Sequence, residues 1–182
     1  MRSILRLRFA LAVFMALVFA LLELALAADR TYMADFSADA PTVEVSSSNL
    51  GAFPRIDGQS RLSSRFYGEA SPIEQISRTL GQPLAPRQAL GLGLVTAALD
   101  DIDWSDEIRI VLEERASLSP DALTGMEANL RFGGAETTET RVFGRLSAWQ
   151  NWIFIRPNAV GPEGALKTFG TGTKAKFDWD RV

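Results

Sequence analysis

The chain of 182 residues is 47% hydrophobic and 23% charged, which is typical of an ordinary globular domain with one core. Its net charge of −3 arises from 22 acidic and 19 basic side chains spread along the chain, so we expect no nucleic-acid surface. Histidine and cysteine are both absent. This absence excludes a Ser-His-Asp or Cys-His nucleophile, a disulfide framework and the usual Cys/His zinc site, and we expect no metal site. A catalyst here has to use carboxylates, tyrosine, arginine, backbone amides or a borrowed cofactor.

Two interpretations fit the N-terminal segment. Three arginines precede the apolar run of residues 9–22, and Ala25-Leu26-Ala27 is typical of the small-x-small site at which a secretory signal is cut. As a helix, this 14-residue run is about 21 Å long, shorter than the ~30 Å hydrocarbon core, so we expect no stable membrane span. As part of a core helix instead, the segment places the Glu23 carboxylate among apolar neighbours and buries a face made of Leu21, Leu24 and Ala28.

Short strands and helices are predicted between residues 30 and 99. In chain order they are strands at 30–35 and 41–46, a loop at 47–59, a helix at 60–68, a helix from Ser71 to Gly81, a helix from Pro86, and a buried strand at 93–99. Ser71 is the expected N-cap of its helix because Pro72 follows at a favoured first position, and Gly81 is the expected stop.

The second half of the chain is predicted to be mainly helical. Ser105 is expected to cap one helix, and Ser119-Pro120-Asp121 is expected to open the next. Residues 136–156 are rich in strand-forming side chains, but their apolar positions have a helical spacing of i, i+4, i+7 and i+11. These positions are Val142, Leu146, Trp149 and Ile153, and Pro157 ends the predicted helix.

Four stretches occur in the order and at the distances found in one enzyme superfamily. They are "ELALAADRTYM", "NLGAFPRIDGQSRLSSRFYG", "LGLVTAAL" and "PEGALKTFGTGTKAKFDW". Together they resemble the crotonase (enoyl-CoA hydratase/isomerase) superfamily. The matching positions are Glu23, Asp29 and Tyr32, then Gly51, Pro54, Gly58, Arg61 and Leu62, then Gly93-Leu94-Val95 and Glu163-Gly164.

Within that superfamily, residues 100–132 and 139–161 resemble the C-terminal part of the benzoyl-CoA-dihydrodiol lyases, which open the ring of epoxidised benzoyl-CoA in aerobic benzoate degradation. The resemblance implies an α/β, partial crotonase-like module of the ββα-spiral type, truncated at its N-terminus, with a helical C-terminal region. The implied regions are an apolar helix at 1–20, a crotonase-like core portion at 21–100, and a packing or oligomerisation region at 101–182.

The resemblance also implies a chemistry that suits a chain without histidine. In this superfamily two backbone amides polarise an acyl-CoA thioester while carboxylates move protons. Glu23 corresponds to the first catalytic glutamate, the amide of Ala20 to half of the oxyanion hole, and Ser47 to the position of the second glutamate. A serine is not a proton acceptor of the same kind, so we do not expect hydration by paired glutamates. The leucines around Glu23 predict a partly desolvated carboxylate, the environment in which such a group serves as an acid or base.

The resemblance further implies partners and a location. The substrate is an acyl-CoA thioester, which itself carries coenzyme A, so no separate cofactor is expected. We expect a homo-oligomer or association with a missing N-terminal module, a cytoplasmic location, and no turnover by the fragment alone. The alternative is a small exported or interaction domain with a cleaved signal and no acyl-CoA chemistry, in which Glu23 has no role. The Trp149 and Trp152 pair fits a core or subunit contact better than a groove for an aromatic acyl group.

Overall fold

The computed structural model describes residues 21–36, 40–131 and 135–181. Its contacts divide the chain into two compact units, Met1–Asp106 and Glu107–Val182, and each unit is described by itself. The predicted oxyanion amide of Ala20 and residues 9–20 of the apolar run interpreted as a signal lie outside the described part. Within the described residues, no helix is long and apolar enough to cross a membrane.

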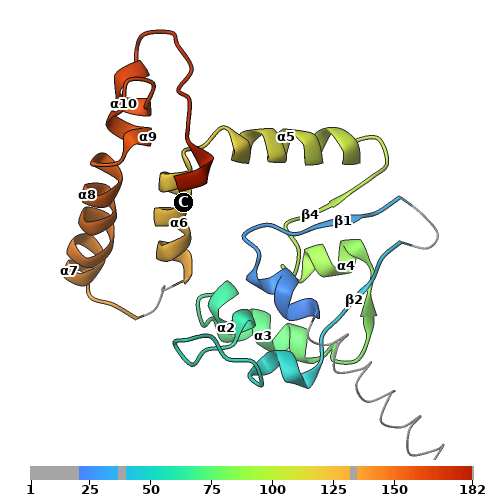
Figure 1. The fold of residues 1–182 in the computed structure, drawn as a ribbon. Coiled ribbons are helices and arrows are strands. Elements are labelled where there is room, and N and C mark those ends of the chain that lie inside the picture. Colours follow the sequence, from blue (N-terminus) through green and yellow to red (C-terminus); the bar gives the residue numbers. More distant parts are fainter. Residues whose placement is uncertain (1–20, 37–39, 132–134, 182) are drawn as a thin grey trace, which may run out of the picture. The chain divides into compact units, whose positions relative to one another are not determined.

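Two small sheets organise the first unit. Strand β1 (Tyr32–Ala34) pairs in parallel with β4 (Ala97–Leu99), and β2 (Val43–Glu44) pairs antiparallel with β3 (Pro83–Leu84) (Figure 1). In the parallel pair, Met33 lies opposite Ala98, and both are buried. The predicted strands at 30–35 and 41–46 are therefore confirmed, while the strand predicted at 93–99 begins only at Ala97.

A tight turn explains the late start of β4. Gly93 has a φ of +71°, in the left-handed region that glycine adopts without a steric penalty. A Cβ atom at this position would lie 3.0 Å from Cε1 of Phe66. The chain therefore uses Gly93 to turn closely past the Phe66 ring before the strand begins.

Helices of one to two turns surround these strands. They are the segment 21–27, the 3-10 helix η1 (Ser47–Leu50), α2 (Arg61–Arg65), α3 (Ala70–Ser77) and α4 (Pro86–Gly91). The N-cap of α3 is Glu69, so the prediction of Ser71 as the cap was wrong. Because the first turn of a helix has no intrahelical partners for its N–H groups, Pro72 is tolerated inside that turn and does not have to mark its first residue.

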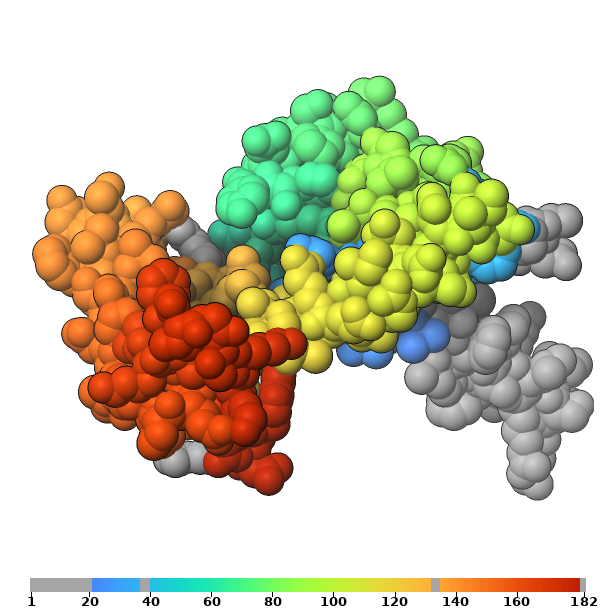
Figure 2. All heavy atoms as spheres, turned by 90° about the horizontal axis from the view of Figure 1, so that it is seen from above, coloured from blue at the N-terminus to red at the C-terminus, as the bar shows by residue number. Residues whose placement is uncertain are grey.

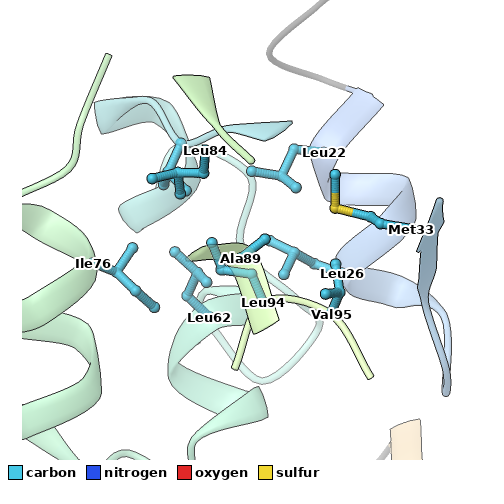
Figure 3. Packing of buried hydrophobic residues seen from close by; sticks show 10 residues of the cluster. Leu22, Leu26, Met33, Leu62, Ile76, Leu84, Ala89, Leu94 and Val95 are labelled. Atoms are coloured by element: carbon cyan, nitrogen blue, oxygen red, sulfur yellow. The ribbon is translucent and has the colours of Figure 1, made fainter. Parts of the chain in front are cut away.

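The core of the first unit collects apolar side chains from the helical segment 21–27, the strands β1 and β3, the helices α2, α3 and α4, and the chain between them (Figure 3). Its buried members are Leu22, Leu26, Met33, Val45, Leu62, Ile76, Leu84, Ala89, Leu94 and Val95. The predicted buried face of the N-terminal helix was wrong, because Leu21 and Leu24 are 59% and 69% exposed and Ala28 is also exposed. Leu22 and Leu26 are buried instead, so Glu23 turns inward beside them.

The second unit is helical within the described residues. After α5 (Trp104–Ala116), which starts one residue before the predicted cap Ser105, come α6 (Pro120–Arg131), α7 (Thr138–Arg141), the π-helix η2 (Val142–Ser147), α8 (Ala148–Phe154), α9 (Pro157–Val160), α10 (Ala165–Thr168) and the 3-10 turn η3 (Trp179–Arg181). The helical prediction for 136–156 is confirmed.

The predicted apolar stripe along this helix is broken at its middle. Side chains of Trp149 and Ile153 pack on Gly125 of α6, where a Cβ atom would lie 3.2 Å from Ile153 Cδ1. Val142 and Leu146 are exposed instead. The wider turns of η2 explain the break, because i→i+5 hydrogen bonding rotates the following residues away from a regular α-helical stripe.

We expect Leu62→Ala to lower the free energy of unfolding by about 2–5 kcal/mol, because Leu62 is fully buried and its truncation leaves a cavity. Urea unfolding followed by circular dichroism measures this change. Leu24→Ala is the matched control, and its exposed side chain predicts a small effect. A larger loss in the control than in Leu62→Ala would contradict the core described above.

Candidate functional site

Glu23 is a buried carboxylate with a hydrogen-bond donor on each oxygen. Its residue is 7% exposed, and it lies on the helical segment 21–27 beside buried Leu22 and Leu26. Oε1 accepts a hydrogen bond from Nδ2 of Asn49 at 2.8 Å, and Oε2 accepts one from Nη1 of Arg61 at 2.8 Å. Because both oxygens act as acceptors, this geometry is that of an ionised carboxylate. The Glu23 carboxylate is therefore buried, and it binds an amide and a guanidinium.

Asn49 is held by the residue that precedes its own helical turn. Ser46 has an extended backbone with φ of −106° at the start of η1. Its backbone N–H and its hydroxyl both donate to Oδ1 of Asn49, at 2.9 and 3.1 Å. With Oδ1 occupied by two donors, the amide group of Asn49 has only one orientation that directs Nδ2 to Glu23.

Arg61 joins the carboxylate to the preceding loop. It is the first residue of α2, whose N-cap Ser60 accepts a hydrogen bond from the backbone N–H of Ser63 at 3.0 Å. Nη1 of Arg61 also donates to the backbone carbonyl of Phe53 at 3.2 Å. The Arg61 side chain is 29% exposed, so the ion pair with Glu23 lies at the edge of the buried region.

The loop that carries Phe53 is closed on itself. The backbone N–H of Arg55 donates to the carbonyl of Gln59 at 2.8 Å, and the N–H of Gly58 donates to the carbonyl of Arg55 at 2.9 Å. Gly58 has a φ of +79°, which this turn requires. The loop of residues 51–59 is therefore a compact turn that Arg61 ties to Glu23.

The other residues of the sequence motif are placed differently. Ser47, at the position of the second family glutamate, is exposed at the start of η1. Glu44 lies in β2 opposite Pro83 of β3, Tyr32 is in β1 and Asp29 is exposed. Asn49, two residues after Ser47, is the group that reaches Glu23, and sequence reasoning missed it. The spacing Ser46-x-x-Asn49 is that of a capping box, and this was the available signal.

Lysines line a separate pocket in the second unit. Two adjoining pockets of about 340 and 310 Å³ share Pro162, Glu163 and Lys176. The second is lined by every lysine of the sequence together with three threonines, namely Lys167, Lys174, Lys176, Thr168, Thr171 and Thr173. The hydrogen bond from Nζ of Lys176 to Oε1 of Glu163, at 2.5 Å, raises the pKa of Lys176, and the Coulombic attraction adds to this effect. These pockets are described apart from Glu23, which lies in the other unit.

The aromatic pair is half-buried in the second unit, where Trp149 packs beside Gly125 of α6. The rings of Trp149 and Trp152 meet edge to face with centroids 5.4 Å apart, and the guanidinium of Arg156 lies 4.4 Å from the Trp152 ring centroid. Nε of Arg156 also donates to Oδ1 of Asp121 at 3.0 Å, and Asp121 is fully buried. The cluster thereby links α8 and the start of α9 to the start of α6.

Comparisons with known proteins agree with the predicted resemblance. No family model matches the chain. Over 162 residues the chain is 60% identical to the benzoyl-CoA-dihydrodiol lyase of Aromatoleum evansii, and the alignment covers 89% of this chain and 29% of the lyase. The chain therefore spans less than a third of the length of this curated relative.

Two solved structures have the same fold. An enoyl-CoA hydratase from Geobacillus kaustophilus HTA426 superposes with a TM-score of 0.60 at 20% identity, covering 86% of this chain and 56% of that one. An enoyl-CoA hydratase/isomerase family member superposes with a TM-score of 0.54 at 16% identity, covering 83% and 52%. The predicted fold class and the predicted resemblance are confirmed: the chain has part of the crotonase fold, and its sequence is similar to a benzoyl-CoA-dihydrodiol lyase.

Proposed function

We propose that the chain binds an acyl-CoA thioester and that Glu23 is the general acid/base of a reaction related to that of the benzoyl-CoA-dihydrodiol lyases. The observation that carries the proposal is the burial of Glu23 with one donor on each carboxylate oxygen. The sequence similarity to the lyase of Aromatoleum evansii supports the substrate class. In the parent reaction, the ring of epoxidised benzoyl-CoA opens with loss of formate.

The geometry leaves Glu23 able to exchange a proton. An ionised carboxylate has about four lone-pair sites, and Asn49 and Arg61 occupy two of them among the described contacts. In the proposed mechanism, a substrate proton binds at a remaining lone-pair site while both partners stay bound. Because Ser47 is exposed and Asn49 is not titratable, the proposed chemistry uses one carboxylate instead of a pair. The backbone amide of Ala20, outside the described residues, remains the proposed oxyanion donor.

The lysine-lined pocket supports recognition of the coenzyme A part. Coenzyme A carries phosphate groups, and ammonium and hydroxyl groups are their usual donors. Three lysines and three threonines line one pocket of about 310 Å³ in the second unit. We propose that these residues bind coenzyme A equally strongly in the ground state and in the transition state. They then affect KM and leave kcat unchanged.

We expect Glu23→Gln to bind the thioester as the wild type does and to lower kcat at least about 100-fold, the usual contribution of a general acid/base. Turnover of epoxidised benzoyl-CoA and of crotonyl-CoA measures kcat, and isothermal titration with benzoyl-CoA measures binding. Lys174→Met is the contrasting variant, because we expect it to raise KM and to leave kcat unchanged.

The outcomes separate the parts of this proposal. Equal nonzero rates for wild type and Glu23→Gln remove Glu23 from the mechanism. Binding without turnover by the wild type overturns catalysis by the chain and keeps acyl-CoA recognition. Absence of binding to benzoyl-CoA overturns both and favours an interaction module.

The raised pKa of Lys176 predicts a pH dependence of the second unit. A lysine whose pKa is higher in the folded than in the unfolded chain contributes stability below the unfolded pKa, and this contribution is lost as pH rises through the folded pKa. We therefore expect Lys176 to stay charged to higher pH in the wild type than in a chain without the Glu163 carboxylate. An NMR titration of the lysine side chains measures this difference. Glu163→Gln should return Lys176 to the ordinary lysine range, and an unchanged titration in this variant would show that another group causes the shift.

The second unit also supports a role in association. Large apolar side chains are exposed in η2 and at the C-terminal end of α8, a segment that lies at the surface seen in Figure 2 (orange). They are Val142, Phe143, Leu146, Phe154 and Ile155. Exposed clusters of this kind are typical of protein contacts. We propose that this segment mediates self-association or packing on a further crotonase-like module.

We expect Phe143→Ser combined with Leu146→Ser to shift the chain to a smaller species in sedimentation velocity, because the substitutions remove exposed apolar area from the contact. Leu24→Ser, which is exposed in the other unit, is the control. A wild-type chain that sediments as a monomer at all concentrations would contradict self-association.

A further inference from the structure

We propose that Asn49 and Arg61 are positioning residues for Glu23, and that Arg61 couples the carboxylate to the loop of residues 51–59. This inference rests on the proposed acid/base function of Glu23 and extends it to two residues that act through the carboxylate. Both partners donate at 2.8 Å, one to each oxygen, so they fix the rotation of the carboxylate plane as well as its position. A carboxylate held at one oxygen alone would still rotate.

Asn49 supplies the neutral half of this arrangement. It is 1% exposed, and Ser46 fixes its orientation through two hydrogen bonds to Oδ1. The donor that reaches Glu23 is therefore set by the backbone at the start of η1. Because η1 precedes the loop of residues 51–59 directly, the same turn of chain determines both the amide and the beginning of the loop.

Arg61 supplies the charged donor to Glu23 and connects the carboxylate to the loop of residues 51–59. A single nitrogen, Nη1, donates both to Oε2 of Glu23 and to the carbonyl of Phe53. The planar guanidinium directs its N–H groups in fixed directions, so a displacement of the Phe53 carbonyl changes the direction available to Glu23. Phe53 itself is partly exposed on this loop. A ligand that moves or orders the loop would thereby alter the placement of the carboxylate.

Two substitutions of Arg61 separate charge from geometry. Arg61→Lys keeps the positive charge and loses the planar fork, whereas Arg61→Gln keeps a planar donor and loses the charge. We expect both to lower kcat by about tenfold to a hundredfold with little change in KM, as for a misplaced catalytic group.

A second measurement does not depend on turnover. Amide hydrogen exchange of residues 51–59 should become about tenfold faster in both Arg61 variants, the change expected for loss of one charge-assisted hydrogen bond. Asn49→Ala tests the other partner and should lower kcat. Arg87→Gln is the matched control, because Arg87 pairs with Asp35 in the same unit at an exposed position. It should leave the exchange of residues 51–59 and kcat unchanged.

The outcomes distinguish this inference from the function on which it rests. If the wild type is active and Arg61→Lys and Asn49→Ala keep its kcat, the positioning role is overturned and the function of Glu23 stands. If exchange of residues 51–59 is unchanged in both Arg61 variants, the coupling to the loop is overturned. If the wild type is inactive, the proposed function fails, and the exchange measurement alone decides the coupling.

Discussion

The arrangement of the first unit depends on one buried negative charge. Glu23 points into the same core as Leu22 and Leu26, and an unpaired carboxylate in such a place would cost several kcal/mol. Arg61 of α2 compensates the charge through Oε2, and Asn49 of η1 donates a hydrogen bond to Oε1. Burial of this one side chain therefore requires the helical segment 21–27, η1 and α2 to lie in contact. These contacts fix the position of the carboxylate, although the strands of this unit are short.

The ion pair between Glu23 and Arg61 is better explained by its effect on the position of the carboxylate than by a gain in folding free energy. A buried pair gains little free energy over well-packed apolar side chains, because desolvation offsets most of the attraction. Removing only one partner leaves a buried charge and is costly. With both Glu23 and Arg61 present, the carboxylate has a fixed orientation, and Arg61 remains partly exposed at the edge of the core. The proposed acid/base role requires such a fixed orientation.

The sequence predicted the order of elements better than the contacts between them. Strands at 30–35 and 41–46 and the helix at 136–156 followed from local patterns, which depend on neighbours in the chain. The buried face of the helix at Glu23 did not, because nearly every residue from 21 to 28 is apolar and periodicity selects no face. Asn49 and Arg61 are 26 and 38 residues from Glu23, so only the folded chain brings them together. Residue spacing also contains no signal for the π-helix that turns Val142 and Leu146 outward.

The two units divide the proposed work in a way that kinetics can separate. Lysine and threonine side chains in the second unit suit the phosphates of a carrier that does not react, and such contacts are equally strong before and during the chemical step. The carboxylate in the first unit acts only where charge or a proton moves. In the proposed function, a chain without histidine, and with a serine in place of the second glutamate, depends on one buried carboxylate for proton transfer.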